Sequence, residues 1–183
     1  MAGSSRLFFA LWPDNQTRLQ LLRISKALEV KGFKSVLPNN FHVTLVFLGN
    51  IDAATELLIK DAAEEFSAQP VKLIFDQLSY WQKPNVLCLT CSNSVKEIEL
   101  LVISLNAGVA QCGVQTEIRP YLPHITLCRH AGYLPVISFE PVSWQAESYC
   151  LVESCSEPSG VGYHVKQQWP FIAGNASWNS IDK

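Results

Sequence analysis

The stretch FHVTLVFL at residues 41–48 reads almost the same as PHITLCR at residues 123–129. Each holds the pattern His-x-Thr-Leu inside a run of apolar and β-branched residues, which is typical of a buried strand. The two histidines, His42 and His124, lie 82 positions apart (124 − 42 = 82). A repeat of this kind predicts a duplicated half-site, with one strand supplied by each half of the chain.

Alternation along a strand places the histidine and the threonine of each motif on the same face. His42 therefore shares a face with Thr44, and His124 shares a face with Thr126. The opposite faces carry apolar residues that we expect to be buried: Val43, Leu45, Phe47, Ile125 and Leu127. If the halves are related by a pseudo-twofold axis, the two His/Thr pairs face each other across a polar groove.

Composition indicates a folded protein with a large core, because 48% of the 183 residues are hydrophobic and 16% are charged. We expect one domain over residues 1–183 and a monomer. The net charge of −2 excludes a global basic field, so nucleic acid would bind through a local patch. No secretory peptide or membrane span is visible, which predicts a cytoplasmic location and reduced thiols for the six cysteines.

Hydrophobic periodicity predicts the element order β-α-β-α-β-β-α-β-β-β. Asp14 and Asp52 are the expected N-caps of the first two helices, and Ser94 with Glu97 forms a capping box for a third helix over 94–112. The strands are expected over 6–12, 41–48, 71–81, 86–92, 124–129, 142–153 and 163–169. This order predicts a bilobal α+β fold of two pseudo-twofold-related antiparallel sheets, with outer helices and the active-site groove between the lobes. We expect a loose tail over 173–183.

Two imidazoles in one groove can cleave a phosphodiester by acid/base catalysis without a metal. A neutral imidazole takes a proton from the attacking water, and a protonated imidazole gives one to the departing oxygen. The hydroxyls of Thr44 and Thr126 can donate to the non-bridging phosphate oxygens. Arg129 would add a charged donor, although simple alternation puts it on the face opposite His124 unless the strand bends, bulges or ends there.

Several further segments extend the pattern: RLFFAL at 6–11, FLG at 47–49, RPYLP at 119–123 and LVES at 151–154. With the two His-x-Thr-Leu motifs, they resemble the two-histidine (2H) phosphoesterases. Within that superfamily the chain is most similar to the RNA 2′,3′-cyclic phosphodiesterases, also called 2′-5′ RNA ligases. The resemblance covers nearly the whole chain.

The resemblance implies metal-independent hydrolysis of an RNA or nucleotide 2′,3′-cyclic phosphate to a 2′-phosphomonoester, with no cofactor. It also implies a reversible joining of RNA ends through a 2′-5′ linkage. By position, His42 would be the proton donor to the departing 3′ oxygen and His124 the proton acceptor that activates water. Thr44, Thr126 and Arg129 would bind the phosphate.

Other interpretations remain open at this point. The groove would also suit another small substrate, such as an ADP-ribose cyclic phosphate or a 2′-5′ oligonucleotide, or it would serve a non-catalytic RNA- or nucleotide-binding module. Tyr121, and Phe9 as an alternative, are candidates for stacking on a base, with Tyr121 the more exposed of the two. Outlying phosphate contacts are proposed for three basic residues: Lys34, Arg119 and Lys166.

Overall fold

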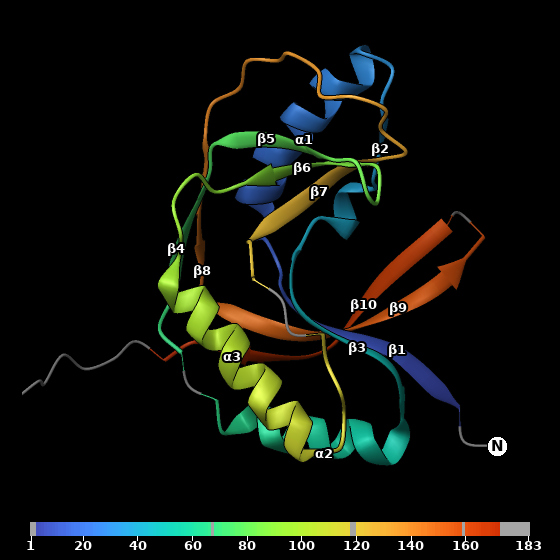
Figure 1. The fold of residues 1–183 in the computed structure, drawn as a ribbon, viewed down its shortest axis with the longest axis vertical. Coiled ribbons are helices and arrows are strands. Elements are labelled where there is room, and N and C mark those ends of the chain that lie inside the picture. Colours follow the sequence, from blue (N-terminus) through green and yellow to red (C-terminus); the bar gives the residue numbers. More distant parts are fainter. Residues whose placement is uncertain (1–2, 67, 118–119, 159, 173–183) are drawn as a thin grey trace, which may run out of the picture.

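The computed structural model describes residues 3–66, 68–117, 120–158 and 160–172 (Figure 1). The predicted tail over 173–183 and Arg119 lie outside these residues. The helices are α1 (Asn15–Val30), α2 (Ala53–Glu64) and α3 (Lys96–Gln111), with a 3-10 turn η1 (Pro38–Asn40). The strands are β1 (Ser4–Leu11), β2 (Lys34–Ser35), β3 (Val43–Asp52), β4 (Val71–Phe75), β5 (Gln77–Trp81), β6 (Val86–Thr90), β7 (His124–Arg129), β8 (Val142–Ala146), β9 (Ser148–Glu157) and β10 (Gly160–Pro170).

The two motif strands, β3 and β7, meet at the centre of the larger of two antiparallel sheets. Its order is β10-β9-β1-β3-β7-β6-β5, with β2 beside β7, and the second sheet pairs β4 with β8. β3 and β7 share one residue pair, Val43 with Ile125, so the large sheet divides there into two lobes (Figure 1). The predicted α+β class with two antiparallel sheets is confirmed.

Each lobe is covered by a helix that the chain contributes from the other lobe. α1 connects β1 to β3 but packs against β2, β7 and β8, whereas α3 connects β6 to β7 but packs against α2 and β3. The β1-α1-β3 and β6-α3-β7 units thus mirror one another in their connectivity. One hydrophobic cluster runs through both lobes, including Leu11, Leu45, Leu89 and Ile125. This shared core fixes the lobes around the joint between β3 and β7.

The helix starts follow the sequence in two cases of three. The carboxylate of Asp14 accepts a hydrogen bond from the backbone of Thr17, and that of Asp52 accepts from the backbone at the start of α2, so both predicted N-caps are confirmed. The predicted capping box at Ser94 is wrong. α3 begins after Val95 with no side-chain cap, and the Ser94 hydroxyl donates to Glu99 instead.

Two predicted long strands are each broken in the middle. The stretch 71–81 breaks at Asp76, whose carboxylate accepts hydrogen bonds from the backbone N–H and the hydroxyl of Ser92. The stretch 142–153 breaks at Glu147. The first halves of both stretches pair as β4 and β8, while the second halves, β5 and β9, join the large sheet. Apolar residues lie on both sides of each break, so a run of strand-forming residues does not by itself show where one strand ends.

Strand β3 also departs from the predicted alternation. Its register with β1 shifts twice, leaving Leu45 and Leu48 as bulges, and it continues past Gly49 to Asp52. Val46 and Leu48 are therefore buried together with Leu45, whereas Phe47, predicted to be buried, is 55% exposed.

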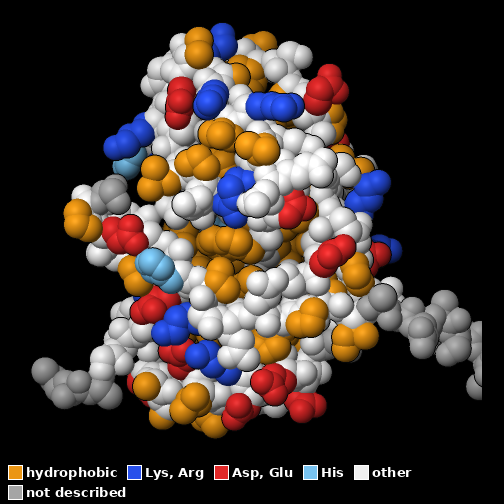
Figure 2. Space-filling model, turned by 180° about the vertical axis from the view of Figure 1, so that it is seen from behind, with side chains coloured by type: hydrophobic (Ala, Val, Ile, Leu, Met, Phe, Trp, Pro, Cys, Tyr) orange, Lys and Arg blue, Asp and Glu red, His pale blue; other side chains and the backbone are white. Residues whose placement is uncertain are grey.

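Surface charge is mixed rather than basic. Figure 2 shows the face opposite to that of Figure 1, where side chains of both signs are interspersed and apolar side chains gather around the middle of the molecule. Within the described residues, no helix has the length and apolar content needed to span a bilayer. None of the six cysteines forms a disulfide within the described residues.

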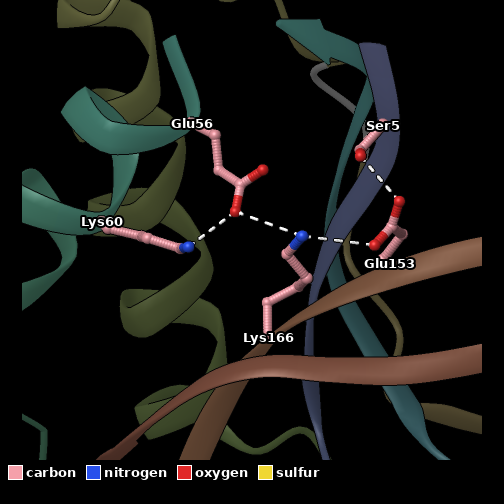
Figure 3. A network of polar contacts seen from close by, with 5 residues as sticks. All are labelled: Ser5, Glu56, Lys60, Glu153 and Lys166. Atoms are coloured by element: carbon pink, nitrogen blue, oxygen red, sulfur yellow. Dashed lines mark hydrogen bonds and ion pairs between the residues drawn. The ribbon is translucent and has the colours of Figure 1, made fainter. Parts of the chain in front are cut away.

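A network of charged side chains ties α2 to the outer strands of the large sheet (Figure 3). The ammonium of Lys166 on β10 lies 3.3 Å from Glu153 and 3.7 Å from Glu56, and Lys60 lies 2.6 Å from Glu56. Ser5 donates to the second oxygen of Glu153 at 2.6 Å. Lys166 is therefore engaged in binding α2 to the sheet, and its contact with a phosphate stays a prediction.

Candidate active site

The joint between β3 and β7 brings the two motifs together. When residue i of one strand pairs with residue j of an antiparallel strand, residue i−1 lies opposite residue j+1, and residue i+1 lies opposite residue j−1. Because Val43 pairs with Ile125, this arrangement turns His42 toward Thr126 and His124 toward Thr44. Thr44 and His124 line one cavity, which agrees with this placement.

Both histidines are fixed through the same ring nitrogen. Nδ1 of His42 lies 2.7 Å from the carbonyl oxygen of Asn40, and Nδ1 of His124 lies 2.9 Å from that of Leu122. A carbonyl only accepts, so Nδ1 carries the proton in each ring and Nε2 is the basic atom of the neutral imidazole. Nε2 of His42 lies 3.0 Å from the Thr44 hydroxyl, which donates to it in this state.

Aromatic rings enclose His42 on three sides. Trp12 stacks on it at 5.7 Å and 13°, Tyr163 meets it edge-on at 4.9 Å, and Phe8 lies at 5.1 Å. Trp81 packs against His124 at 4.4 Å. Trp81 and Tyr163 were not singled out in the sequence, because strand pairing brings them to the motifs from distant positions and no spacing signal marks them.

Burial keeps His42 neutral. Desolvation in the aromatic enclosure lowers the pKa of His42 to about 4, and the bond to the Asn40 carbonyl offsets only part of this effect. The charge of Arg129, and that of His124 when its ring is protonated, lowers this pKa further. At neutral pH the ligand-free site therefore holds an uncharged imidazole at position 42.

The bulge that Arg129 requires is present in β7. Pairing with β6 shifts register so that Cys128 faces Leu87 while Thr126 faces Cys88, which leaves Leu127 as the extra residue. Leu127 and Cys128 are consequently both buried, and Arg129 returns to the face that carries Thr126. Its guanidinium is exposed at the strand end.

The threonines differ in their exposure. Thr44 is 8% exposed and pairs with the neighbouring strand β1, whereas Thr126 is half-buried. The backbone carbonyl of Thr44 accepts a hydrogen bond of 2.8 Å from the hydroxyl of Tyr121. This bond joins the segment before the second motif to the strand of the first.

Of the two predicted base-stacking residues, the structure contradicts Phe9, whereas Tyr121 stays a prediction because it lines a cavity beside His124. Phe9 has no exposed surface and packs at 6.0 Å against Tyr149 and at 6.0 Å against Trp169 in the core, so a base cannot reach it. Tyr121 is half-buried rather than exposed, and burial raises the pKa of its hydroxyl, which is bound to the Thr44 carbonyl. Phe8, the neighbour of Phe9 on β1, lies on the histidine side and contacts His42 at 5.1 Å.

A cavity of about 610 Å³ opens beside His124. Its wall includes Thr44, Phe47, Trp81 and His124, and it continues along α3. Among the described residues, no group of three or more His, Cys, Asp or Glu side chains is placed to hold a metal ion.

Comparison with known proteins agrees with this fold and sequence pattern. A family model described as LigT-like phosphoesterase matches residues 11–88. A protein of Archaeoglobus fulgidus named RNA 2′,3′-cyclic phosphodiesterase is 35% identical over 151 residues, covering 81% of this chain and 85% of the relative. One of Escherichia coli with the same name is 27% identical over 154 residues, covering 84% and 86%.

The solved structures of E. coli LigT have the same fold. The apo form superposes with a TM-score of 0.82 at 25% identity, covering 92% of this chain and 98% of that one. The complex of LigT with 3′-AMP superposes with a TM-score of 0.81 and the same coverage. The resemblance seen in the two His-x-Thr-Leu motifs is thereby confirmed, and the chain belongs to the LigT-like phosphoesterase family, whose relatives are named RNA 2′,3′-cyclic phosphodiesterase.

Proposed function

We propose that this protein hydrolyses RNA or nucleotide 2′,3′-cyclic phosphates to 2′-phosphomonoesters through His42 and His124. The names of its relatives support the reaction. The observation that carries the mechanism is the pairing of Val43 with Ile125, because it sets the two imidazoles on either side of one joint. A single phosphate bound over this joint lies within reach of both rings.

In the proposed reaction, Nε2 of His124 takes a proton from a water molecule as the water oxygen attacks phosphorus. The bond between phosphorus and the 3′ oxygen breaks, and Nε2 of His42 gives its proton to that oxygen. The products are a 3′-hydroxyl and a 2′-phosphomonoester, and the proton count balances through the two rings. In both rings the backbone carbonyl on Nδ1 stabilises the protonated form and fixes the ring's direction.

The proton donor must acquire its proton when substrate binds, since His42 is neutral in the ligand-free protein. A phosphate brings negative charge between His42, His124 and Arg129. It therefore offsets the charge of Arg129, which lowers the pKa of His42, and favours the imidazolium. In this proposal the binding of substrate therefore also leads to the protonation of His42, the general acid.

The remaining motif residues bind the phosphate in this proposal. The Thr44 hydroxyl turns from Nε2 of His42 to a phosphate oxygen once that nitrogen is protonated, and Thr126 donates from the opposite strand. Arg129, brought to the same face by the bulge at Leu127, neutralises the charge that builds on the non-bridging oxygens.

Ligation follows from the same geometry. If the 5′-hydroxyl of a second RNA replaces water as the nucleophile, displacement of the 3′ oxygen leaves a 2′-5′ phosphodiester. His124 would deprotonate that hydroxyl in the same way. We therefore propose that hydrolysis and 2′-5′ joining share both histidines.

The decisive experiment is incubation of the protein with a 2′,3′-cyclic nucleotide in the presence of a chelator, followed by chromatographic identification of the monophosphate. We expect the 2′ isomer at an undiminished rate. A 3′-monophosphate would contradict the assigned bond cleavage, and a loss of activity with chelator would contradict the metal-independent mechanism.

A further inference from the structure

We propose that the cavity between α3 and β3 is a nucleoside subsite that selects bases carrying an exocyclic amino group. This inference rests on the proposed function, since it assigns the phosphate of the same ligand to the histidines. It adds a binding site for the part of the substrate that does not react.

The cavity is continuous with the reacting groups. Thr44 and His124 form one end of its wall, and α3 forms the other through Glu99, Val102 and Ile103. Its volume of about 610 Å³ lies within the range of small-molecule sites and exceeds what a phosphate alone requires. A ligand whose phosphate lies between the histidines therefore has room for its nucleoside in this cavity.

The walls suit the flat, weakly polar face of a base. Leu45 and Val46 from β3 lie opposite Val102 and Ile103 from α3. Trp81, which packs on His124 at 4.4 Å, also lines the cavity and offers an aromatic ring between the phosphate end and the apolar walls.

Glu99 provides the basis for selecting among bases. A carboxylate has about four acceptor positions, and Glu99 uses one for the Ser94 hydroxyl at 3.1 Å. The amide of Asn106, also in the wall, is engaged with the Val102 carbonyl and the Thr116 hydroxyl. Adenine, cytosine and guanine carry amino groups that donate to a carboxylate, and uracil carries none.

The test compares kcat/KM for the four nucleoside 2′,3′-cyclic phosphates with that for methyl riboside 2′,3′-cyclic phosphate, which lacks a base. We expect the amino-bearing nucleotides to exceed the base-free substrate about tenfold or more, as one stacked base typically contributes. Glu99→Gln should bring these three nucleotides closer to uridine, because a neutral amide is a weaker acceptor.

A bulky side chain at the rim supplies the matched comparison. Ile103 and Leu100 are both 63% exposed on α3, but Ile103 lines the cavity and Leu100 does not. Ile103→Trp should reduce the ratio of nucleotide to base-free kcat/KM toward one, and Leu100→Trp should keep the wild-type ratio. Equal ratios in these two variants, or a wild-type ratio near one, would overturn the subsite.

Calorimetric titration separates failure of this inference from failure of the proposed function. Turnover without base dependence would reject the subsite and leave the function standing. Without any turnover the function would fail, and binding of adenosine 3′-monophosphate against ribose phosphate would then decide the subsite. Tighter binding of the nucleotide that is lost in Ile103→Trp supports it, and equal binding of both ligands rejects it.

Discussion

His42 and His124 are held by the same contact, since Nδ1 of each ring donates to the carbonyl of the residue two positions earlier, Asn40 at 2.7 Å and Leu122 at 2.9 Å. The contact fixes the tautomer of both neutral rings and directs Nε2 away from the backbone. Three aromatic rings enclose His42, whose burial lowers its pKa to about 4, while Trp81 lies 4.4 Å from His124. One repeated motif thus gives two imidazoles whose protonation can differ, as acid/base catalysis requires.

Replacing either motif histidine by alanine should reduce kcat about 10²–10⁴-fold on a 2′,3′-cyclic nucleotide, because each variant lacks one proton-transfer group. Steady-state kinetics measures the loss. His164→Ala is the matched control, since His164 is exposed and bonded to Glu157 outside the site. A His42 or His124 variant as active as this control would remove that residue from the mechanism.

Binding of a phosphate should raise the pKa of His42 from about 4 toward neutrality, because the anion favours the protonated ring and offsets the charge of Arg129. The titration of the His42 ring, followed by NMR with and without a 2′-nucleotide, gives both values. The Arg129→Gln variant, which removes this charge, should start from a higher ligand-free pKa. If the pKa stays near 4 in the complex, His42 cannot be the general acid at neutral pH.

Asn40 connects His42 to the β9–β10 hairpin. Its carbonyl holds Nδ1 of His42, and its side-chain amide donates to the Val161 carbonyl at 2.8 Å. Asn40→Ala keeps the first bond and loses the second, so the ring should be less well fixed. We expect kcat to fall about tenfold, in line with one hydrogen bond, and KM to change little.

The exposed Asn50 on β3 gives a matched control for that substitution. Asn50→Ala should leave kcat at the wild-type value. An Asn40→Ala variant with normal kcat, or one whose loss lies entirely in KM, would show that the hairpin does not position the ring.

The repeated motif was sufficient to predict the central part of the fold and of the candidate site. His-x-Thr fixes which side chains share a face. The direct pairing of the two strands at Val43 and Ile125 within one sheet was not predicted, because it depends on long-range register. The N-caps Asp14 and Asp52 were predictable because capping depends on a few adjacent residues.

The features that the sequence did not reveal depend on long-range pairing. Bulges at Leu45, Leu48 and Leu127 change which face a residue occupies, and they arise from register with a neighbouring strand. The rings of Trp81 and Tyr163 reach the histidines for the same reason. Phe9 was assigned to the wrong side because adjacent phenylalanines in a strand look equivalent until the buried face is known.

Tyr121→Phe should lower the free energy of unfolding by about 1 kcal/mol, the net value of a hydrogen bond, because the Thr44 carbonyl loses its 2.8 Å partner. Urea denaturation measures the change. Tyr80→Phe is the control, since its hydroxyl makes an exposed 3.2 Å bond to Asn85 and should contribute less. Equal effects in both variants would mean that the Tyr121 bond does not stabilise the motif strand.

The free energy of unfolding should fall as the pH decreases from 6.5 toward 4, because of His42. The pKa of His42 is about 4 in the folded protein and near 6.5 in the unfolded chain. Between pH 6.5 and 4, His42 is therefore protonated in the unfolded chain but not in the folded protein, and this protonation stabilises the unfolded state relative to the folded one. The loss should reach about 2 kcal/mol at about pH 5 relative to neutral pH.

Carboxylates also titrate toward acid, so the measurement is the difference in urea unfolding between wild type and His42→Gln at each pH. The variant should show a shallower dependence than the wild type between pH 6.5 and 5. Parallel curves would mean that His42 is not buried as a neutral ring, and the need for substrate to load its proton would disappear with it.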